Sequence, residues 1–203
     1  MNVPAITCGS RLGQGADRPA TFVFVPGLRD HDPNHWQTHL AGQLEKSVTV
    51  EPLRENKLSL AARVERLDRT LEGIGGDVIL VAHSAGALIA VHWAQSATRP
   101  IRAALLVAPV DVERPLPEGY PCFGELADHG WMPIPRDPLP FPALVVASRN
   151  DPLAEPTRTE AFASDWGAKI FDAGEVGHLN PAAGFGPWPA AHWLLARLLI
   201  ETN

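Results

Sequence analysis

The stretch from Asp77 to Ala94 constrains the fold most, because in it a buried strand runs directly into a helix. Val78 to Val81 is a short apolar run rich in β-branched residues, typical of a strand that is covered on both faces. From Ala87 onward the apolar residues recur with the spacing of one helical face. A strand covered on both faces needs helices on both sides of its sheet, so this unit predicts an α/β fold.

The corner between the strand and the helix reads Ala82-His83-Ser84-Ala85-Gly86. A strand, a sharp turn with a serine and a helix are together the context of a nucleophile elbow, Gly-x-Ser-x-Gly, although Ala82 stands where glycine is usual. Such a turn places the serine hydroxyl clear of the sheet and beside the N–H groups that begin the helix. We therefore interpret Ser84 as a candidate nucleophile; the alternative is a serine that only caps a buried helix.

The rest of the chain continues the alternation of strands and helices. Apolar runs predict further strands at residues 21–25, 48–53, 103–108, 143–147 and 168–171. Helices are predicted from Asp32 and Pro33 onward and at 59–73, 156–166 and 187–200. In the helix at 59–73, the arginines 63, 66 and 69 are expected to point outward. This order predicts a three-layer α/β/α sandwich with a mostly parallel sheet of about six strands.

The length of the chain predicts one domain. A chain of 203 residues can bury a full core without disulfides, so we expect residues 1–203 to form a single domain. Residues 1–18 are polar and contain glycine, and we expect a loosely ordered lead-in there. Residues 109–142 are rich in proline and lack periodicity, which predicts an excursion beside the active site or a stretch with no ligand role. The sequence leaves open whether this excursion acts as a lid.

Two candidate partners for Ser84 follow later strands. Asp151 comes just after the strand at 143–147, and His178 lies in the loop after the strand at 168–171. The carboxyl ends of parallel strands meet at one edge of the sheet, and Ser, Asp, His is the chain order of elbow hydrolases. A serine hydroxyl needs a general base, and the base needs an orienting acid. We predict a triad of Ser84, His178 and Asp151, with Asp111 as the alternative acid.

An acyl-transfer site also needs donors for the oxyanion and walls for a pocket. We expect one donor to be the N–H of Ala85, which follows the nucleophile, and the other to be the N–H of Leu28, after the first strand. His83 is a candidate for the lining of the site. The aromatic and sulfur-containing candidates for the walls and roof of an apolar pocket are Trp36, Trp188, Trp131, Phe123 and Met132.

Composition and charge argue against several other classes. A net charge of −6 gives no electrostatic footprint for nucleic acid or an anionic membrane. No apolar run approaches the roughly 20 residues of a membrane span. Cys8 and Cys122 form neither a metal-ligand pattern nor a disulfide framework, and the first ten residues do not resemble a secretory signal. We therefore expect a cytoplasmic protein with reduced thiols.

Three histidines raise the question of a metal site. His31, His35 and His39 recur every four residues, a spacing that on a helix can present metal ligands. Pro33 places His31 ahead of the helix, however, and no glutamate completes a zinc-protease motif. We expect neither a metal ion nor another cofactor.

Several short segments together resemble a known family. They are Val25-Pro26-Gly27, His35-Trp36, Ala82 to Ala87, Ser148-x-x-Asp151-Pro152 and Gly177-His178. The chain resembles, from about Thr21 to Ile200, the small single-domain serine hydrolases typified by retinoblastoma-binding protein 9, within the α/β-hydrolase superfold. The segment from Gly177 to Trp188 is similar to that of bacterial members.

The resemblance implies a minimal α/β-hydrolase fold without a large cap domain, the triad Ser84, Asp151 and His178, and no cofactor. It also implies activity on small ester or amide substrates. The Leu-x-Cys-x-Glu signature for retinoblastoma binding is absent, so that partnership is not implied.

The predicted function is a serine hydrolase, most like a carboxylesterase, that forms an acyl-enzyme on Ser84. An amidase, peptidase or thioesterase would use the same acyl-transfer core and differ in pocket shape. The alternative from another class is a binding module with a vestigial triad, because a fold alone does not fix function. The expected partner is a small ester or amide, with no nucleic acid and no membrane, and the chain is expected to be a monomer or a small homo-oligomer.

Overall fold

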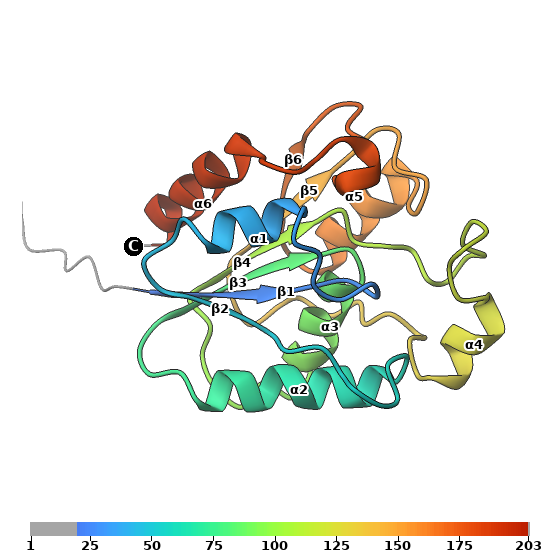
Figure 1. The fold of residues 1–203 in the computed structure, drawn as a ribbon, viewed down its shortest axis with the longest axis horizontal. Coiled ribbons are helices and arrows are strands. Elements are labelled where there is room, and N and C mark those ends of the chain that lie inside the picture. The colour runs from blue at the N-terminus through green and yellow to red at the C-terminus, as the bar shows by residue number, and fades with distance from the viewer. Residues whose placement is uncertain (1–19, 203) are drawn as a thin grey trace, which may run out of the picture.

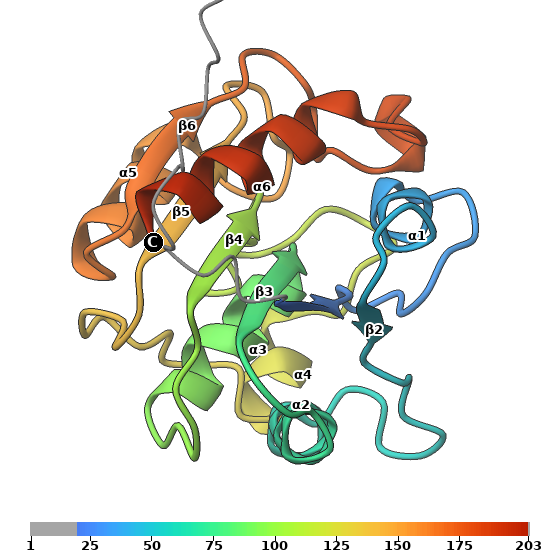
Figure 2. The same ribbon diagram turned by 90° about the vertical axis from the view of Figure 1, so that its left-hand side faces the viewer.

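The computed structural model describes residues 20–202, in which helices cover both faces of one parallel sheet (Figures 1 and 2). The strands are β1 (Thr21–Val25), β2 (Ser47–Thr49), β3 (Val78–His83), β4 (Ala103–Val107), β5 (Ala143–Ala147) and β6 (Lys169–Asp172). Their spatial order is β2-β1-β3-β4-β5-β6, and every neighbouring pair is parallel. The predicted sandwich and strand number are confirmed, while the predicted lead-in at 1–18 lies outside the described residues.

The sheet separates two hydrophobic core clusters, and helices cover both of them. The helices are α1 (Trp36–Ala41), α2 (Leu60–Glu72), α3 (Ala85–Ala94), α4 (Phe123–Asp128), α5 (Pro156–Asp165) and α6 (Pro189–Glu201), with a 3₁₀ turn at Pro181–Ala183. Side chains of α2, α3 and α5 pack in one core cluster, and those of α1 and α6 pack in the other. All of β3 is buried, and its alternate residues belong to different clusters. The central strand therefore carries the nucleophile from the most enclosed part of the fold.

Two elements near the amino terminus are shorter than predicted. Helix α1 begins at Trp36 and not at Asp32, because Asp32 accepts a hydrogen bond from the N–H of Asn34 at 2.8 Å and forms a turn. His35 is the N-cap instead, and its Nδ1 accepts from the N–H of Gln37 at 3.2 Å. Strand β2 ends at Thr49, three residues before Pro52, which has no N–H to donate to a ladder.

The proline-rich excursion at 109–142 contains one short helix and is tied to the body of the protein. Helix α4 begins with a capping box between Cys122 and Glu125. Trp131 is fully buried, and its Nε1 donates to the carbonyl of Leu58 at 2.7 Å. The excursion therefore packs beside α2, as Figure 1 also shows. Among residues 20–202, no helix is long and apolar enough to span a bilayer.

Candidate active site

Ser84 lies in a strained turn between β3 and α3. Its backbone has φ 57° and ψ −126°, a conformation that costs a non-glycine residue about 1–3 kcal/mol. Its N–H donates to the carbonyl of Val107 at 2.9 Å, which fixes the turn to β4. A Cβ on Gly86 would lie 2.0 Å from the carbonyl oxygen of Val25, so the elbow needs glycine at 86. Ala82 is fully buried within β3, and its methyl group is accommodated there.

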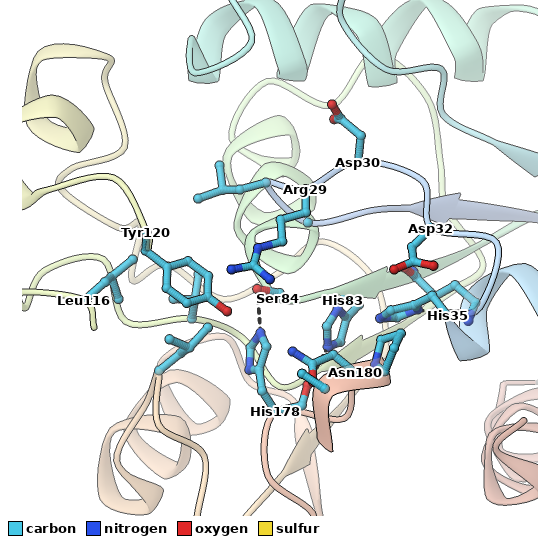
Figure 3. A pocket seen from close by; sticks show the side chains of 17 residues that line it. Arg29, Asp30, Asp32, His35, His83, Ser84, Leu116, Tyr120, His178 and Asn180 are labelled. Atoms are coloured by element: carbon cyan, nitrogen blue, oxygen red, sulfur yellow. Dashed lines mark hydrogen bonds between the residues drawn. The ribbon is translucent and has the colours of Figure 1, made fainter. Parts of the chain in front are cut away.

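A continuous chain of hydrogen bonds joins Ser84 to His178 and Asp151. The distance from Ser84 Oγ to His178 Nε2 is 2.8 Å, as Figure 3 shows. His178 Nδ1 lies 2.8 Å from Asp151 Oδ2 and 3.0 Å from Oδ1. Ser84 and His178 are buried, with 8% and 4% of their surface exposed. The described residues therefore contain a Ser-His-Asp arrangement of the kind that activates a serine.

The loops that carry the acid and the base are bonded to each other. The side chain of Asn150 accepts from the N–H of Gly177 at 2.7 Å, and Ser148 Oγ accepts from the N–H of Val176 at 3.3 Å. Asp151 Oδ1 also accepts from the N–H of Leu153 at 2.8 Å. These bonds fix the spacing between the two loops before any substrate binds, so the arrangement is preorganised.

The alternative acid, Asp111, is held elsewhere. It is almost fully buried, and its carboxylate lies 3.1 Å from Nε of Arg158. Its Oδ1 accepts from the N–H of Glu113 at 3.2 Å. Asp111 therefore serves an ion pair with α5, and Asp151 is the acid that contacts His178.

Two further histidines pack beside the base. The ring of His83 lies 4.9 Å from that of His178 and 4.6 Å from that of His35. His83 Nε2 donates to the carbonyl of His178 at 2.8 Å, which fixes the proton on that nitrogen. Burial, with the neighbouring His178 and His35, lowers the pKa of His83 well below its ordinary value. His83 therefore supports the backbone of the base as a neutral ring.

We expect the stability of the protein to fall with acid partly because of His35. Burial lowers the pKa of His35 from 6.5 to about 4, against an opposing effect of Asp32. Between these two values the unfolded chain binds a proton that the folded chain does not, so the free energy of unfolding rises with pH across this window. One such group contributes at most about 1.4 kcal/mol per pH unit.

The test is urea unfolding across that window for the parent protein and for His35→Asn. Asparagine keeps a side chain that can cap α1 and removes the titrating ring. The variant should lose less stability than the parent as pH falls from 6.5 toward 4. Equal pH dependence in the two proteins would show that His35 takes up its proton equally well when folded.

Arg63 is buried, which corrects the prediction that it points outward. It lies three residues after Leu60 and four before Leu67, so it belongs to the buried face of α2. Its guanidinium bonds to Asp30 Oδ1 at 3.0 Å and to the carbonyls of Gly27 and Leu28 at 3.4 and 3.2 Å. Arg63 therefore ties the loop after β1 to helix α2. Helical spacing alone was sufficient to predict this placement.

This arginine also orients the predicted oxyanion donor. The Gly27 carbonyl is directed toward Arg63, and the N–H of Leu28 is trans to that carbonyl, so it is directed away from Arg63. Gly27 itself packs against the elbow, since a Cβ there would lie 3.2 Å from Ser84 Cβ. At the start of α3, the N–H of Ala85 has no acceptor within the helix.

We expect Arg63→Met to weaken both the fold and the site. Removing the guanidinium takes a donor from Asp30 and from the carbonyls of Leu28 and Lys57, which should cost about 2–4 kcal/mol of unfolding free energy. The loosened loop should also lower kcat/KM for ester hydrolysis. Arg69→Met on the same helix is the control, because its ion pair with Glu65 is exposed and should contribute under about 1 kcal/mol. Urea unfolding and kinetics that match between the two variants would contradict the proposed support.

A cavity of about 250 Å³ opens directly onto Ser84. His83 and Leu28 are among the residues that line it. Figure 3 shows Leu116 and Tyr120 on one side of Ser84, with His35, Asp32 and Asn180 on the other. Val110 and Leu153 also line the cavity and belong to the hydrophobic cluster against which Leu116 and Tyr120 pack, so this side is apolar.

The predicted tryptophan walls do not line this cavity. Trp131 is a core residue on the side of α2, and Phe123, the other aromatic of the predicted roof, is exposed on α4. Trp36 and Trp188 pack edge to face with their ring centres 5.1 Å apart, and they line a separate cavity between α1 and α6. Val110, Leu116 and Tyr120 are the residues of the excursion that line the cavity.

The predicted absence of a metal rests on the sequence pattern. In the structure His35 caps α1 and packs against His83, while His31 Nδ1 lies 3.4 Å from Thr38 Oγ1. Within residues 20–202, no group of three or more His, Cys, Asp or Glu side chains is arranged to hold a metal ion.

Comparison with known proteins places the chain in a family. A family model described as serine hydrolase matches residues 22–197. A protein from Pectobacterium atrosepticum described as a YdeN-like hydrolase is 37% identical, with a TM-score of 0.77 over 90% of this chain and 92% of that one. A comparison of this sequence with curated proteins found no match.

Two more distant structures share the fold. The ydeN gene product of B. subtilis is 17% identical, with a TM-score of 0.67 over 89% of this chain and 98% of that one. The RedJ thioesterase of Streptomyces coelicolor is 18% identical, with a TM-score of 0.62 over 92% and 91%. The predicted resemblance is confirmed, and the chain belongs to the serine hydrolase family, with a small α/β-hydrolase fold and no large cap domain within residues 20–202.

Proposed function

We propose that this protein hydrolyses small carboxylic esters through an acyl-enzyme on Ser84. The observation that carries the proposal is the unbroken chain of bonds from Ser84 through His178 to Asp151 at the floor of an open cavity. A vestigial triad in a binding module would have no need for the bonds that hold the Asp151 and His178 loops together. The preorganised geometry therefore favours an enzyme over a binding module.

In the proposed reaction, Ser84 Oγ attacks the ester carbonyl while His178 Nε2 takes the hydroxyl proton. The carbonyl oxygen becomes an oxyanion, which accepts hydrogen bonds from the N–H groups of Ala85 and Leu28. His178 then returns its proton to the departing alcohol, and the acyl group remains on Ser84. Asp151 holds the Nδ1 proton and stabilises the imidazolium during these steps.

Water completes the cycle by attacking the acyl-enzyme. His178 takes a proton from the water and returns it to Ser84, which releases the carboxylic acid. The cavity of about 250 Å³ favours short acyl or aryl groups, and its apolar side offers Val110, Leu116 and Leu153 as contacts for them. Amides and thioesters would pass through the same acyl-enzyme, so the choice of ester is the finer part of the proposal.

The test is a series of 4-nitrophenyl esters from acetate to decanoate, with matched thioesters and anilides. The proposal predicts kcat/KM that is highest for short acyl chains and that falls for chains too long for the cavity. If kcat/KM is higher for the thioesters than for the matched esters, the protein is better described as a thioesterase. No hydrolysis above the level of Ser84→Ala would contradict the enzyme reading as a whole.

A further inference from the structure

Arg29 is a cation at the mouth of the cavity that the triad does not use. Its guanidinium lies 4.8 Å from the centre of the Tyr120 ring, and both residues line the cavity with Ser84. Figure 3 shows the guanidinium between Tyr120 and Ser84 in that view, directed into the cavity. Within residues 20–202, no carboxylate forms an ion pair with it. Arg29 is exposed, so water can solvate its charge, and what distinguishes it is its place beside Ser84 in the cavity lining.

The carboxylates near Arg29 in sequence are already engaged. Asp30 forms an ion pair with Arg63 at 3.0 Å. Asp32 lies on the far side of Ser84 in Figure 3, and its Oδ1 accepts from the N–H of Asn34. The protein as a whole carries a formal net charge of −6, so a free guanidinium at the cavity mouth runs against the overall charge. An anion that paired with Arg29 would therefore be a bound ligand or an ion from solvent, and not one of these carboxylates.

Tyr120 restrains Arg29 at the apolar side of the cavity. The face of an aromatic ring attracts a guanidinium and leaves its N–H groups free to bind in their plane. Tyr120 stands with Leu116 on that side, and Figure 3 shows its hydroxyl directed toward the cavity. A ligand bound there would contact apolar side chains such as Leu116 along its length and the Arg29 guanidinium at its end. This combination fits a short apolar chain that ends in a carboxylate.

We propose that Arg29 and Tyr120 form an anion subsite, and that the substrates of this protein are esters with a carboxylate at the end of a short apolar group. The inference rests on the proposed hydrolase function and adds the chemical class of the substrate. The apolar group contacts Leu116, and its terminal carboxylate forms two parallel bonds with the Arg29 guanidinium. Arg29 is thus a residue that determines specificity, while the triad performs the reaction.

The first experiment compares 4-nitrophenyl hexanoate with the mono-4-nitrophenyl ester of adipic acid, which has the same chain length and a terminal carboxylate. The parent enzyme should favour the adipate by about 10-fold in kcat/KM, the effect of one charged hydrogen-bonded pair. Arg29→Gln should remove that preference, because kcat/KM for the adipate should fall about 10-fold relative to kcat/KM for the hexanoate. Arg54→Gln changes the net charge equally at an exposed position outside the cavity lining, and it should keep the preference.

A second pair of substrates places the carboxylate on the alcohol side. These are 4-acetoxybenzoate and its methyl ester, which differ in charge but share the acetyl group. A preference for the charged member that depends on Arg29 would support the anion subsite and assign it to the leaving group. Equal rates within both pairs, unchanged in Arg29→Gln, would overturn the inference while leaving the hydrolase function intact.

A binding measurement separates the inference from the failure of the hydrolase proposal. Calorimetry on Ser84→Ala should show that methyl hydrogen adipate binds more tightly than methyl hexanoate. Adding Arg29→Gln to Ser84→Ala should remove the difference. If no ester is hydrolysed but this difference appears, the anion subsite stands without the reaction. If the two esters bind equally, the anion subsite is wrong.

Discussion

Ser84→Ala should abolish ester hydrolysis, with a loss of about 10⁴-fold or more in kcat. The substitution removes Ser84 Oγ, the nucleophilic atom, which lies 2.8 Å from His178 Nε2. The oxyanion donors and the cavity stay in place, so KM should change little. The measurement is steady-state hydrolysis of a short 4-nitrophenyl ester, with the folded state checked by urea unfolding. Activity near that of the parent would show that Ser84 is not the nucleophile.

Because the backbone at Ser84 is strained, we also expect Ser84→Gly and Ser84→Ala to differ in stability. Glycine adopts a positive φ without steric cost, so Ser84→Gly should be more stable than Ser84→Ala by about 1 kcal/mol. Both variants should be inactive. A higher stability of Ser84→Gly than of Ser84→Ala, with both inactive, is the result expected if the active-site turn holds residue 84 in a strained conformation. Equal stability of the two variants would mean that the turn relaxes without cost.

Gly86→Ala should have the largest effect on the fold. A Cβ at this position would lie 2.0 Å from the carbonyl oxygen of Val25 and 2.8 Å from that of Pro26. Both are backbone atoms, so either the end of β1 or the elbow must move by about an ångström. Overpacking of this kind costs about 1–3 kcal/mol in side-chain cores, and more is expected where backbone cannot yield. We expect a loss of at least about 3 kcal/mol and of activity.

Gly124→Ala is the matched control for that prediction. Gly124 is exposed on α4, and a Cβ there meets nothing within 4 Å. Alanine has the higher helix propensity, so this variant should be as stable as the parent or more stable by up to about 1 kcal/mol. Urea unfolding and ester hydrolysis on both variants test the contrast. Parent-like stability of Gly86→Ala would mean that β1 and the elbow are not packed against each other as described.

The triad could be predicted from the sequence because it depends on topology. In a parallel sheet, the residues after successive strands gather at one edge, whatever their separation in the chain. Asp151 follows a strand with a strong apolar pattern, and His178 follows a shorter predicted strand at 168–171, so their meeting with Ser84 needed no knowledge of side-chain packing. The structure brings the three together at hydrogen-bonding distances.

The pocket could not be predicted in the same way, because its walls depend on packing. Trp131 is on the excursion, but its side chain is buried in the core, where its Nε1–H donates a hydrogen bond to the carbonyl of Leu58. Tyr120 and Leu116 reach the cavity from a segment without periodicity, and no local pattern marks them. Arg29 looks like an ordinary loop arginine in sequence. Only its position over Tyr120 distinguishes it.

Labelling with a fluorophosphonate tests directly whether Ser84 is a nucleophile that His178 activates. Ser84 Oγ attacks the phosphorus, fluoride leaves, and His178 takes the hydroxyl proton. Peptide mass spectrometry should find one adduct per chain, located on Ser84, and its rate of formation should fall by orders of magnitude in His178→Ala. An unmodified Ser84 in well-folded protein, or equal labelling in His178→Ala, would contradict the account and bring the binding-module alternative forward.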